Sequence, residues 1–75
     1  MPRDTSLKKR SVRIAGHETS ITMEDEFWDA LRNIAQEAGI STNALITEID
    51  ENSRSNLSSA IRVYILQYLQ SKLTQ

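Results

Sequence analysis

A chain of 75 residues holds one domain at most, and its formal net charge is −1 at pH 7. A chain this short buries only about 60% of the surface that its unfolded form exposes, so such domains often need disulfides, metals or a partner subunit. The absence of cysteine and the single histidine exclude a disulfide framework and a thiolate or multi-histidine metal site within one chain. Oligomerisation is the remaining route, and we expect no cofactor or metal.

The near-neutral charge conceals an uneven distribution along the chain. Residues 1–17 carry five basic side chains and one acidic side chain, a balance of +4, whereas residues 18–75 carry four basic and nine acidic side chains, a balance of −5. A basic segment on an acidic body suggests a polyanionic partner at one end of the molecule, but a solvated tail has the same composition. Because the sequence has neither a secretory apolar stretch nor an apolar run of membrane-spanning length, we expect a cytoplasmic protein.

The N-terminal third predicts an arm followed by extended chain. Residues 1–9 are polar and have no periodicity, which predicts a flexible basic arm ahead of a single domain over residues 10–75. Apolar and polar side chains alternate over residues 11–23, which is typical of a strand with one buried face. The half over residues 18–23 is the better strand prediction, because it leads directly into a helix start.

The rest of the sequence predicts three helices, over about residues 25–38, 42–51 and 57–72. Gly39 is placed to end the first helix and Ser41 to cap the second. The third helix is apolar on most of its faces, which is typical of a buried helix. The residues predicted in the core or in a dimer interface recur at strand or helix spacing: Ile21, Met23, Phe27, Trp28, Leu31, Ile34, Leu45, Ile49, Ile61, Tyr64, Ile65 and Tyr68.

A lone strand needs a pairing partner, because a six-residue strand cannot satisfy its own backbone N–H and C=O groups. Residues 11–14 can fold back on it as a hairpin through a bend at Gly16 and His17. Alternatively, the same strand of a second chain can pair with it antiparallel about a two-fold axis. We favour the second pairing, since a partner chain also covers the third helix, but the sequence leaves open whether residues 10–16 are an arm or an additional strand.

This order of elements resembles the ribbon-helix-helix family of DNA-binding domains. The matching stretch runs from Thr19-Ser-Ile-Thr-Met23 through residues 24–38 to the turn Ala38-Gly39-Ile40-Ser41 and the helix start after it. A small bacterial subgroup is similar over about residues 8–70, on the segments Lys9-Arg10-Ser11-Val12-Arg13-Ile14-Ala15-Gly16-His17, Phe27-Trp28 and Asn56-Leu57-Ser58-Ser59-Ala60-Ile61-Arg62. The resemblance implies a mainly α-helical fold in which one short N-terminal strand from each chain of a homodimer pairs antiparallel and enters the DNA major groove.

The resemblance also implies which residues meet DNA. The outer face of the strand over residues 18–23 carries the candidates for base contacts: Glu18, Ser20 and Thr22. The candidates for phosphate contacts come from the basic segment and from the start of the second helix: Lys8, Lys9, Arg10, Arg13, Ser41, Thr42 and Asn43. The same residues also fit ordinary roles as surface strand positions, a solvated tail and a helix cap.

We therefore expect a small homodimeric transcriptional regulator, repressor-like, that binds double-stranded DNA; assembly beyond a dimer is possible. The alternative is an antitoxin-like or adaptor module that holds a protein partner through the helix over residues 57–72. An enzyme is not expected, because the sequence shows no combination of nucleophile, base or metal ligands.

Overall fold

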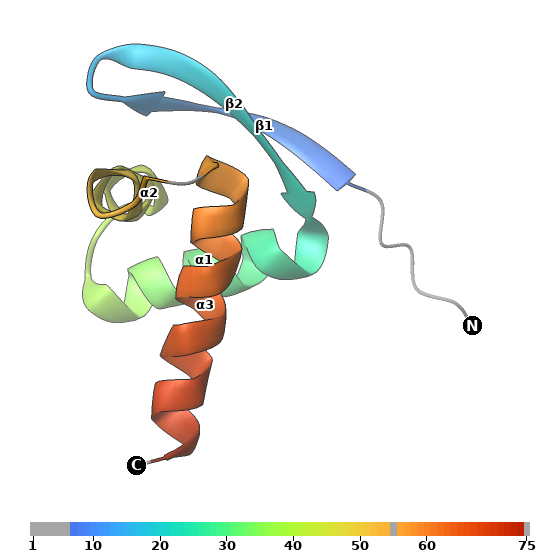
Figure 1. Ribbon diagram of the computed structural model, residues 1–75, viewed down its shortest axis with the longest axis vertical. Helices are drawn as coiled ribbons and strands as arrows, with labels where there is room; N and C mark the ends of the chain where they lie inside the picture. The colour runs from blue at the N-terminus through green and yellow to red at the C-terminus, as the bar shows by residue number, and fades with distance from the viewer. Residues whose placement is uncertain (1–6, 55, 75) are drawn as a thin grey trace.

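The chain forms a two-stranded hairpin followed by three helices. The computed structural model describes residues 7–54 and 56–74, with the elements in this order: β1 (Leu7–Ile14), β2 (His17–Glu24), α1 (Asp25–Ala38), α2 (Thr42–Glu51) and α3 (Leu57–Leu73). The hairpin lies across one end of the three helices, and α3 runs away from it (Figure 1). The three helices confirm the sequence predictions, and α3 extends one residue further than expected. Within the described residues, no helix has the length and apolar character needed to cross a membrane.

The chain forms two N-terminal strands where one short strand was predicted, and residues 18–23 pair with a strand of the same chain instead of relying on a partner chain. β1 and β2 pair antiparallel from Ile14 opposite His17 to Leu7 opposite Glu24. The turn residues Ala15 and Gly16 have φ angles of 53° and 81°, and positive φ at both central positions is the geometry of the two-residue turns that match strand twist. The backbone groups along one edge of β2 are therefore paired with β1 of the same chain.

The boundary of the predicted arm also changes. The sequence assigns residues 7–9 to a flexible arm, but they belong to β1, because the hairpin register continues to the last residue of β2. Residues 1–6 of that arm lie outside the described residues. Of residues 10–16, which the sequence left open as an arm or a strand, residues 10–14 belong to β1 and residues 15–16 form the turn.

Local capping explains why the helices begin and end where they do. Gly39 adopts φ 77° at the end of α1, and the next N–H, that of Ile40, returns to the Ala35 carbonyl at 3.0 Å. The Ser41 hydroxyl accepts a hydrogen bond from the Ala44 N–H at 3.0 Å and caps α2 as predicted. Asn56 caps α3 by accepting from the N–H groups of Ser58 and Ser59.

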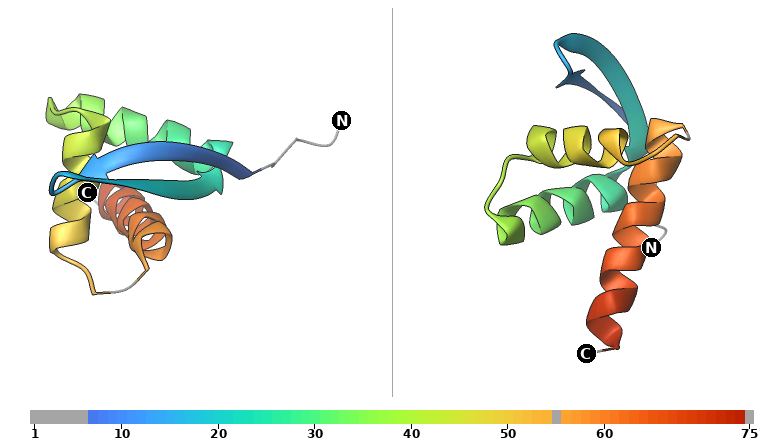
Figure 2. Two further views of the ribbon diagram at one scale, coloured as in Figure 1. Left: turned by 90° about the horizontal axis from the view of Figure 1, so that it is seen from above. Right: turned by 60° about the vertical axis from the view of Figure 1, so that its left-hand side comes forward.

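The core lies between the inner face of the hairpin and the three helices. Its largest fully buried side chains are Ile21, Met23, Leu31, Leu45, Ile46 and Ile61. Phe27, Tyr64 and Tyr68 are partly buried and pack against this cluster. The right view of Figure 2 shows α1 and α2 on one side of α3, and Val63, Leu66, Leu69 and Leu73 of α3 remain exposed.

Candidate nucleic-acid interface

The face of the hairpin that points away from the helices carries short polar and charged side chains. Residues directly opposite in an antiparallel pair point to the same face, and Ile21 and Met23 define the buried face. The other face therefore holds four cross-strand pairs, of which Leu7 with Glu24 lies at the end next to α1. The three remaining pairs are named here the outer ribbon face: Lys9 with Thr22, Ser11 with Ser20, and Arg13 with Glu18. All of them are exposed except Thr22, which is half-buried.

The structure brings together some of the predicted DNA-contact residues and separates others. All three residues predicted to meet bases, Glu18, Ser20 and Thr22, are in the outer ribbon face, and Lys9 and Arg13 join them from β1. Ser11 was not among the predicted contacts; it lies opposite Ser20 and is identifiable only from the hairpin register. Lys8 and Arg10 take the alternate positions of β1 and share the helix-facing side with Met23 and Ile21.

Trp28 of α1 accounts for the placement of Lys8 and Arg10. The indole is buried, and its Nε1–H donates to the Lys8 carbonyl at 3.0 Å. The Arg10 guanidinium lies 5.3 Å from the centre of the Trp28 ring, a cation–π distance. Both contacts bind β1 to α1, so the guanidinium of Arg10 lies at the side of the ribbon and not on its outer face.

The start of α2 is attached to the free edge of β1. The Asn43 Oδ1 accepts from the Arg13 N–H at 3.0 Å, and the Asn43 Nδ2–H donates to the Arg13 carbonyl at 2.7 Å. The side chains of Ser41 and Asn43 are thus engaged within the protein. The backbone N–H groups of a first helical turn have no acceptor within their own helix and can bind an anion. The main chain over residues 41–43, at the start of α2, offers N–H groups of this kind.

A positively charged cleft lies between β1, α1 and the start of α2. Its volume is about 240 Å³. The lining residues are Arg10, Ser11, Val12, Trp28, Arg32, Thr42, Asn43 and Ile46. Two of them carry guanidinium groups, and Arg32 is also paired with Asp29 on α1. The side of the ribbon next to α2 is therefore the more basic side of this region.

Glu24 holds α3 against the end of the ribbon. Its carboxylate is 3.1 Å from the Arg62 guanidinium, which also lies 5.5 Å from the centre of the Phe27 ring. The pKa of Glu24 is lowered, first because the carboxylate accepts a hydrogen bond from its own backbone N–H and second because of the bond from Arg62. The negative charge of Glu24 is thus engaged with α3 and is not part of the outer ribbon face.

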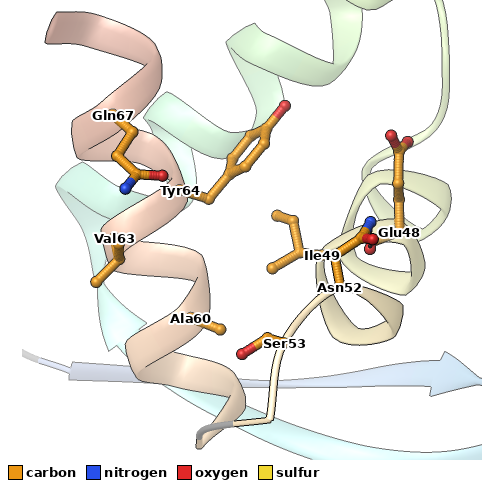
Figure 3. A pocket seen from close by; sticks show the side chains of 8 residues that line it. All are labelled: Glu48, Ile49, Asn52, Ser53, Ala60, Val63, Tyr64 and Gln67. Atoms are coloured by element: carbon orange, nitrogen blue, oxygen red, sulfur yellow. Dashed lines mark hydrogen bonds between the residues drawn. The ribbon is translucent and has the colours of Figure 1, made fainter.

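A second groove lies between the end of α2 and α3 and does not suit a polyanion. Its volume is about 320 Å³, and the side chains around it come from both helices and the connection between them (Figure 3). Glu48 supplies the only formal charge among the residues that line it, beside the neutral groups of Asn52, Tyr64 and Gln67. The charge that favours nucleic acid is therefore concentrated at the hairpin and the adjoining cleft.

An antiparallel ribbon followed by two helices that meet at a tight glycine turn is the architecture of a ribbon-helix-helix domain. The family model described as "Ribbon-helix-helix domain" matches residues 7–69, and the chain belongs to this family. The structure is similar to that of an uncharacterized protein from Bordetella pertussis Tohama I, with a TM-score of 0.75 and 33% sequence identity. The match covers 91% of this chain and 61% of that protein, so the chain spans about 61% of its length. A comparison with curated proteins gave no match.

Proposed function

We propose that this protein is a homodimeric transcriptional regulator of the repressor type that binds double-stranded DNA sequence-specifically, with the outer ribbon face in the major groove. Membership of the ribbon-helix-helix family supports DNA binding and dimerisation. The observation that carries the proposal is the composition of the outer ribbon face, where three hydroxyl groups, two cations and one carboxylate share one two-stranded surface. A two-stranded ribbon has dimensions that the major groove admits.

Each member of the outer ribbon face has a chemistry that suits base edges. The hydroxyls of Ser11, Ser20 and Thr22 donate or accept, so they adapt to several bases. Arg13 presents the planar fork that binds guanine O6 and N7, and Glu18 accepts from the cytosine amino group. Because Glu18 lies directly opposite Arg13, the pair suits a guanine–cytosine base pair better than a phosphate.

Phosphate contacts are assigned to the start of α2 and to the cations of β1. The first turn of α2 meets one phosphate with its backbone N–H groups, while Lys8, Lys9 and Arg10 supply positive charge along β1. Six to eight phosphate contacts per dimer correspond to a slope of log affinity against log salt of roughly −5 to −7.

The test measures the affinity of the full chain for duplexes selected from random DNA, by fluorescence anisotropy over a range of salt concentrations. Lys9→Ala should reduce the magnitude of the salt slope by about 0.9 for each phosphate that the variant no longer neutralises, which is about 1.8 per dimer. Lys72→Ala is the matched control, because it removes the same charge from the end of α3, where Lys72 is paired with Glu37 at 2.6 Å. Equal slopes for the two variants would contradict the proposal.

Base reading has a separate test. Ser20→Ala combined with Thr22→Ala should change which duplexes are preferred, with a loss of about 1–3 kcal/mol at each altered position of the best site, and should leave the salt slope unchanged. If the selected sequences are the same for the variant and the original protein, the ribbon does not read bases.

A second candidate function is a protein-interaction module of the antitoxin or adaptor type that uses α3. The observation in its favour is the row of exposed leucines on that helix, Leu66, Leu69 and Leu73. This function predicts co-purification of a different protein through α3, together with duplex binding that the ribbon variants do not alter.

A further inference from the structure

The side chain of Asn43 in α2 is bonded at two points to the backbone of one residue of the ribbon. Its Oδ1 accepts from the Arg13 N–H at 3.0 Å, and its Nδ2–H donates to the Arg13 carbonyl at 2.7 Å. Both backbone groups of Arg13 are therefore directed away from β2, which makes Arg13 and Glu18 a non-hydrogen-bonded pair of the ladder. In such a pair the two side chains stand closest together. Asn43 thus holds the pair of the outer ribbon face that lies nearest the turn.

The two bonds define one register of the ribbon on α2. Residues whose backbone groups point to the partner strand alternate with residues whose groups point away from it, so Val12 and Ile14 direct their N–H and C=O groups towards β2. A shift of the ribbon by one residue would therefore leave the Asn43 amide without backbone partners on β1. The amide fixes the position of the ribbon along the strand direction as well as its distance from α2.

This contact is the polar attachment of the turn end of the ribbon. Among residues 7–54 and 56–74, the other hydrogen bonds and ion pairs between ribbon and helices involve Lys8, Thr22 and Glu24, at the end away from the turn. Figure 1 and the left view of Figure 2 show the turn on the side of α2. The buried Ile14 side chain also holds this end on the core, but apolar packing is non-directional. The register at the turn end therefore depends on Asn43.

Asn43 also belongs to the part of α2 that is proposed to bind a DNA phosphate. The Ser41 hydroxyl and carbonyl accept from the N–H groups of Ala44 and Leu45. Within the described residues, the N–H groups of Thr42 and Asn43 have no acceptor, so they are the groups available to an anion. One residue therefore offers its backbone to the phosphate and its side chain to the ribbon.

We infer that Asn43 is a positioning residue for base reading: it couples the start of α2 to Arg13, so that the phosphate bound at α2 fixes where Arg13 and Glu18 meet the base edges. The inference rests on the proposed DNA binding and adds the residue that sets the distance between the two kinds of contact. A bidentate arginine–guanine contact needs two N–H groups in line with O6 and N7, and such a geometry is kept only when supporting contacts hold the group to within about 0.5 Å. Without the amide, phosphate and base contacts can each still form, but the formation of one no longer positions the other.

The test compares the affinity of the full chain for its selected duplex with its affinity for duplexes changed at one base pair at a time, by fluorescence anisotropy. Arg13→Ala first identifies the base pair that Arg13 reads, and it keeps both bonds to Asn43 because they go to the backbone. A good bidentate contact discriminates there by about 5- to 150-fold. Asn43→Ala should reduce the preference at that base pair at least about threefold, and should leave the preference at the positions that Ser20→Ala with Thr22→Ala alters within about twofold.

A merely structural role of Asn43 would not produce this pattern. A loss of stability lowers the fraction of folded protein, which weakens binding to every duplex by the same factor and leaves the ratios of Kd values unchanged. The salt slope should also stay unchanged, because Asn43→Ala removes no charge. Asn52→Ala is the matched control, because it makes the same substitution at the opposite end of α2, where the side chain donates to the Glu48 carbonyl at 2.9 Å. It should leave all base preferences unchanged.

The double variant gives a second readout. In the Arg13→Ala background there is no guanidinium to position, so Asn43→Ala should reduce the preference at that base pair by a smaller factor than in the wild-type chain. An equal factor in both backgrounds, full preference retained in Asn43→Ala, or an equal loss at every base pair would each overturn the inference and leave DNA binding in place. A wild-type chain that prefers no duplex would instead contradict the proposed function, and the inference with it.

Discussion

Asn43 is the residue whose removal most directly tests how the ribbon is held on the helices. Its side chain makes two hydrogen bonds to the backbone of Arg13, at 3.0 and 2.7 Å, and joins elements 30 residues apart. Asn43→Ala removes both bonds while the partner groups stay accessible to water. At about 0.5–1.5 kcal/mol for each bond, the loss is about 1–3 kcal/mol, with the lower half favoured by exposure. For a domain of this size, 1 kcal/mol corresponds to roughly 4–8 °C in Tm.

Two measurements test this loss of stability. Thermal unfolding gives the change in Tm, and amide hydrogen exchange shows whether the Arg13 N–H loses protection, by about tenfold for each 1.4 kcal/mol. Asn33→Ala is the matched control, because Asn33 is exposed on α1 and the same substitution there reports only the gain in helix propensity. If Asn43→Ala is as stable as Asn33→Ala and the Arg13 N–H exchanges at an unchanged rate, then Asn43 does not hold the ribbon.

Three further predictions concern the contacts around β1 and the end of β2. Trp28→Phe should lower the free energy of unfolding by about 1–2 kcal/mol in urea denaturation, because the bond to the Lys8 carbonyl is lost and a smaller ring fills the site. Arg10→Ala should cost about 0.5–1 kcal/mol by the same assay, since it removes the guanidinium from the Trp28 ring; no change would contradict the cation–π contact. The lowered pKa of Glu24, ordinarily 4.5, means that its charged form adds stability above that pH, which is lost as the pH falls through the folded value. The stability difference between the wild type and Glu24→Gln should therefore be present at neutral pH and shrink below pH 4.5, and a difference that is constant with pH would exclude the contact with Arg62 as its source.

The helices could be predicted because their signals are local. Gly39 ends α1 through its own backbone conformation, and Ser41 and Asn56 cap the helices that follow them within three residues. Such signals need no knowledge of the rest of the fold. The predicted bounds of α1 and α2 match the observed ones for this reason.

The hairpin could not be predicted with the same certainty, because its turn is poorly marked. The turn consists of Ala15 and Gly16, and Ala15 has φ 53°, a conformation that residues with a Cβ atom rarely adopt. The sequence favours a bend at Gly16 and His17 instead. A shift of the turn by one residue changes the partner of Arg13 from Glu18 to Ser20, so the composition of each cross-strand pair depends on a detail that the sequence does not signal.

In the candidate site, too, some residues follow from a local pattern and others depend on contacts between distant segments. Glu18, Ser20 and Thr22 could be assigned to one face from strand alternation alone. The inward position of Arg10 depends on Trp28, which lies on a different element. The engagement of Asn43 depends on the free edge of β1, whose pairing the sequence left open. Contacts between distant segments leave no local pattern, because they arise only when the packed elements meet.

A ribbon completed within one chain changes what a single protomer can read. When a ribbon is built from one strand of each of two identical chains, its two strands present the same residues in opposite directions, and the surface is symmetric. Here β1 presents Lys9, Ser11 and Arg13, while β2 presents Glu18, Ser20 and Thr22. The proposed reading surface is therefore asymmetric within each protomer, and one protomer corresponds to a half-site without internal symmetry.

Symmetry in the DNA site would then come only from the relation between two protomers. A two-fold homodimer predicts two such half-sites in inverted orientation, whereas a monomer that reads DNA alone predicts one half-site without a repeat. The sequences selected from random DNA thus report on the assembly as well as on the bases that are read.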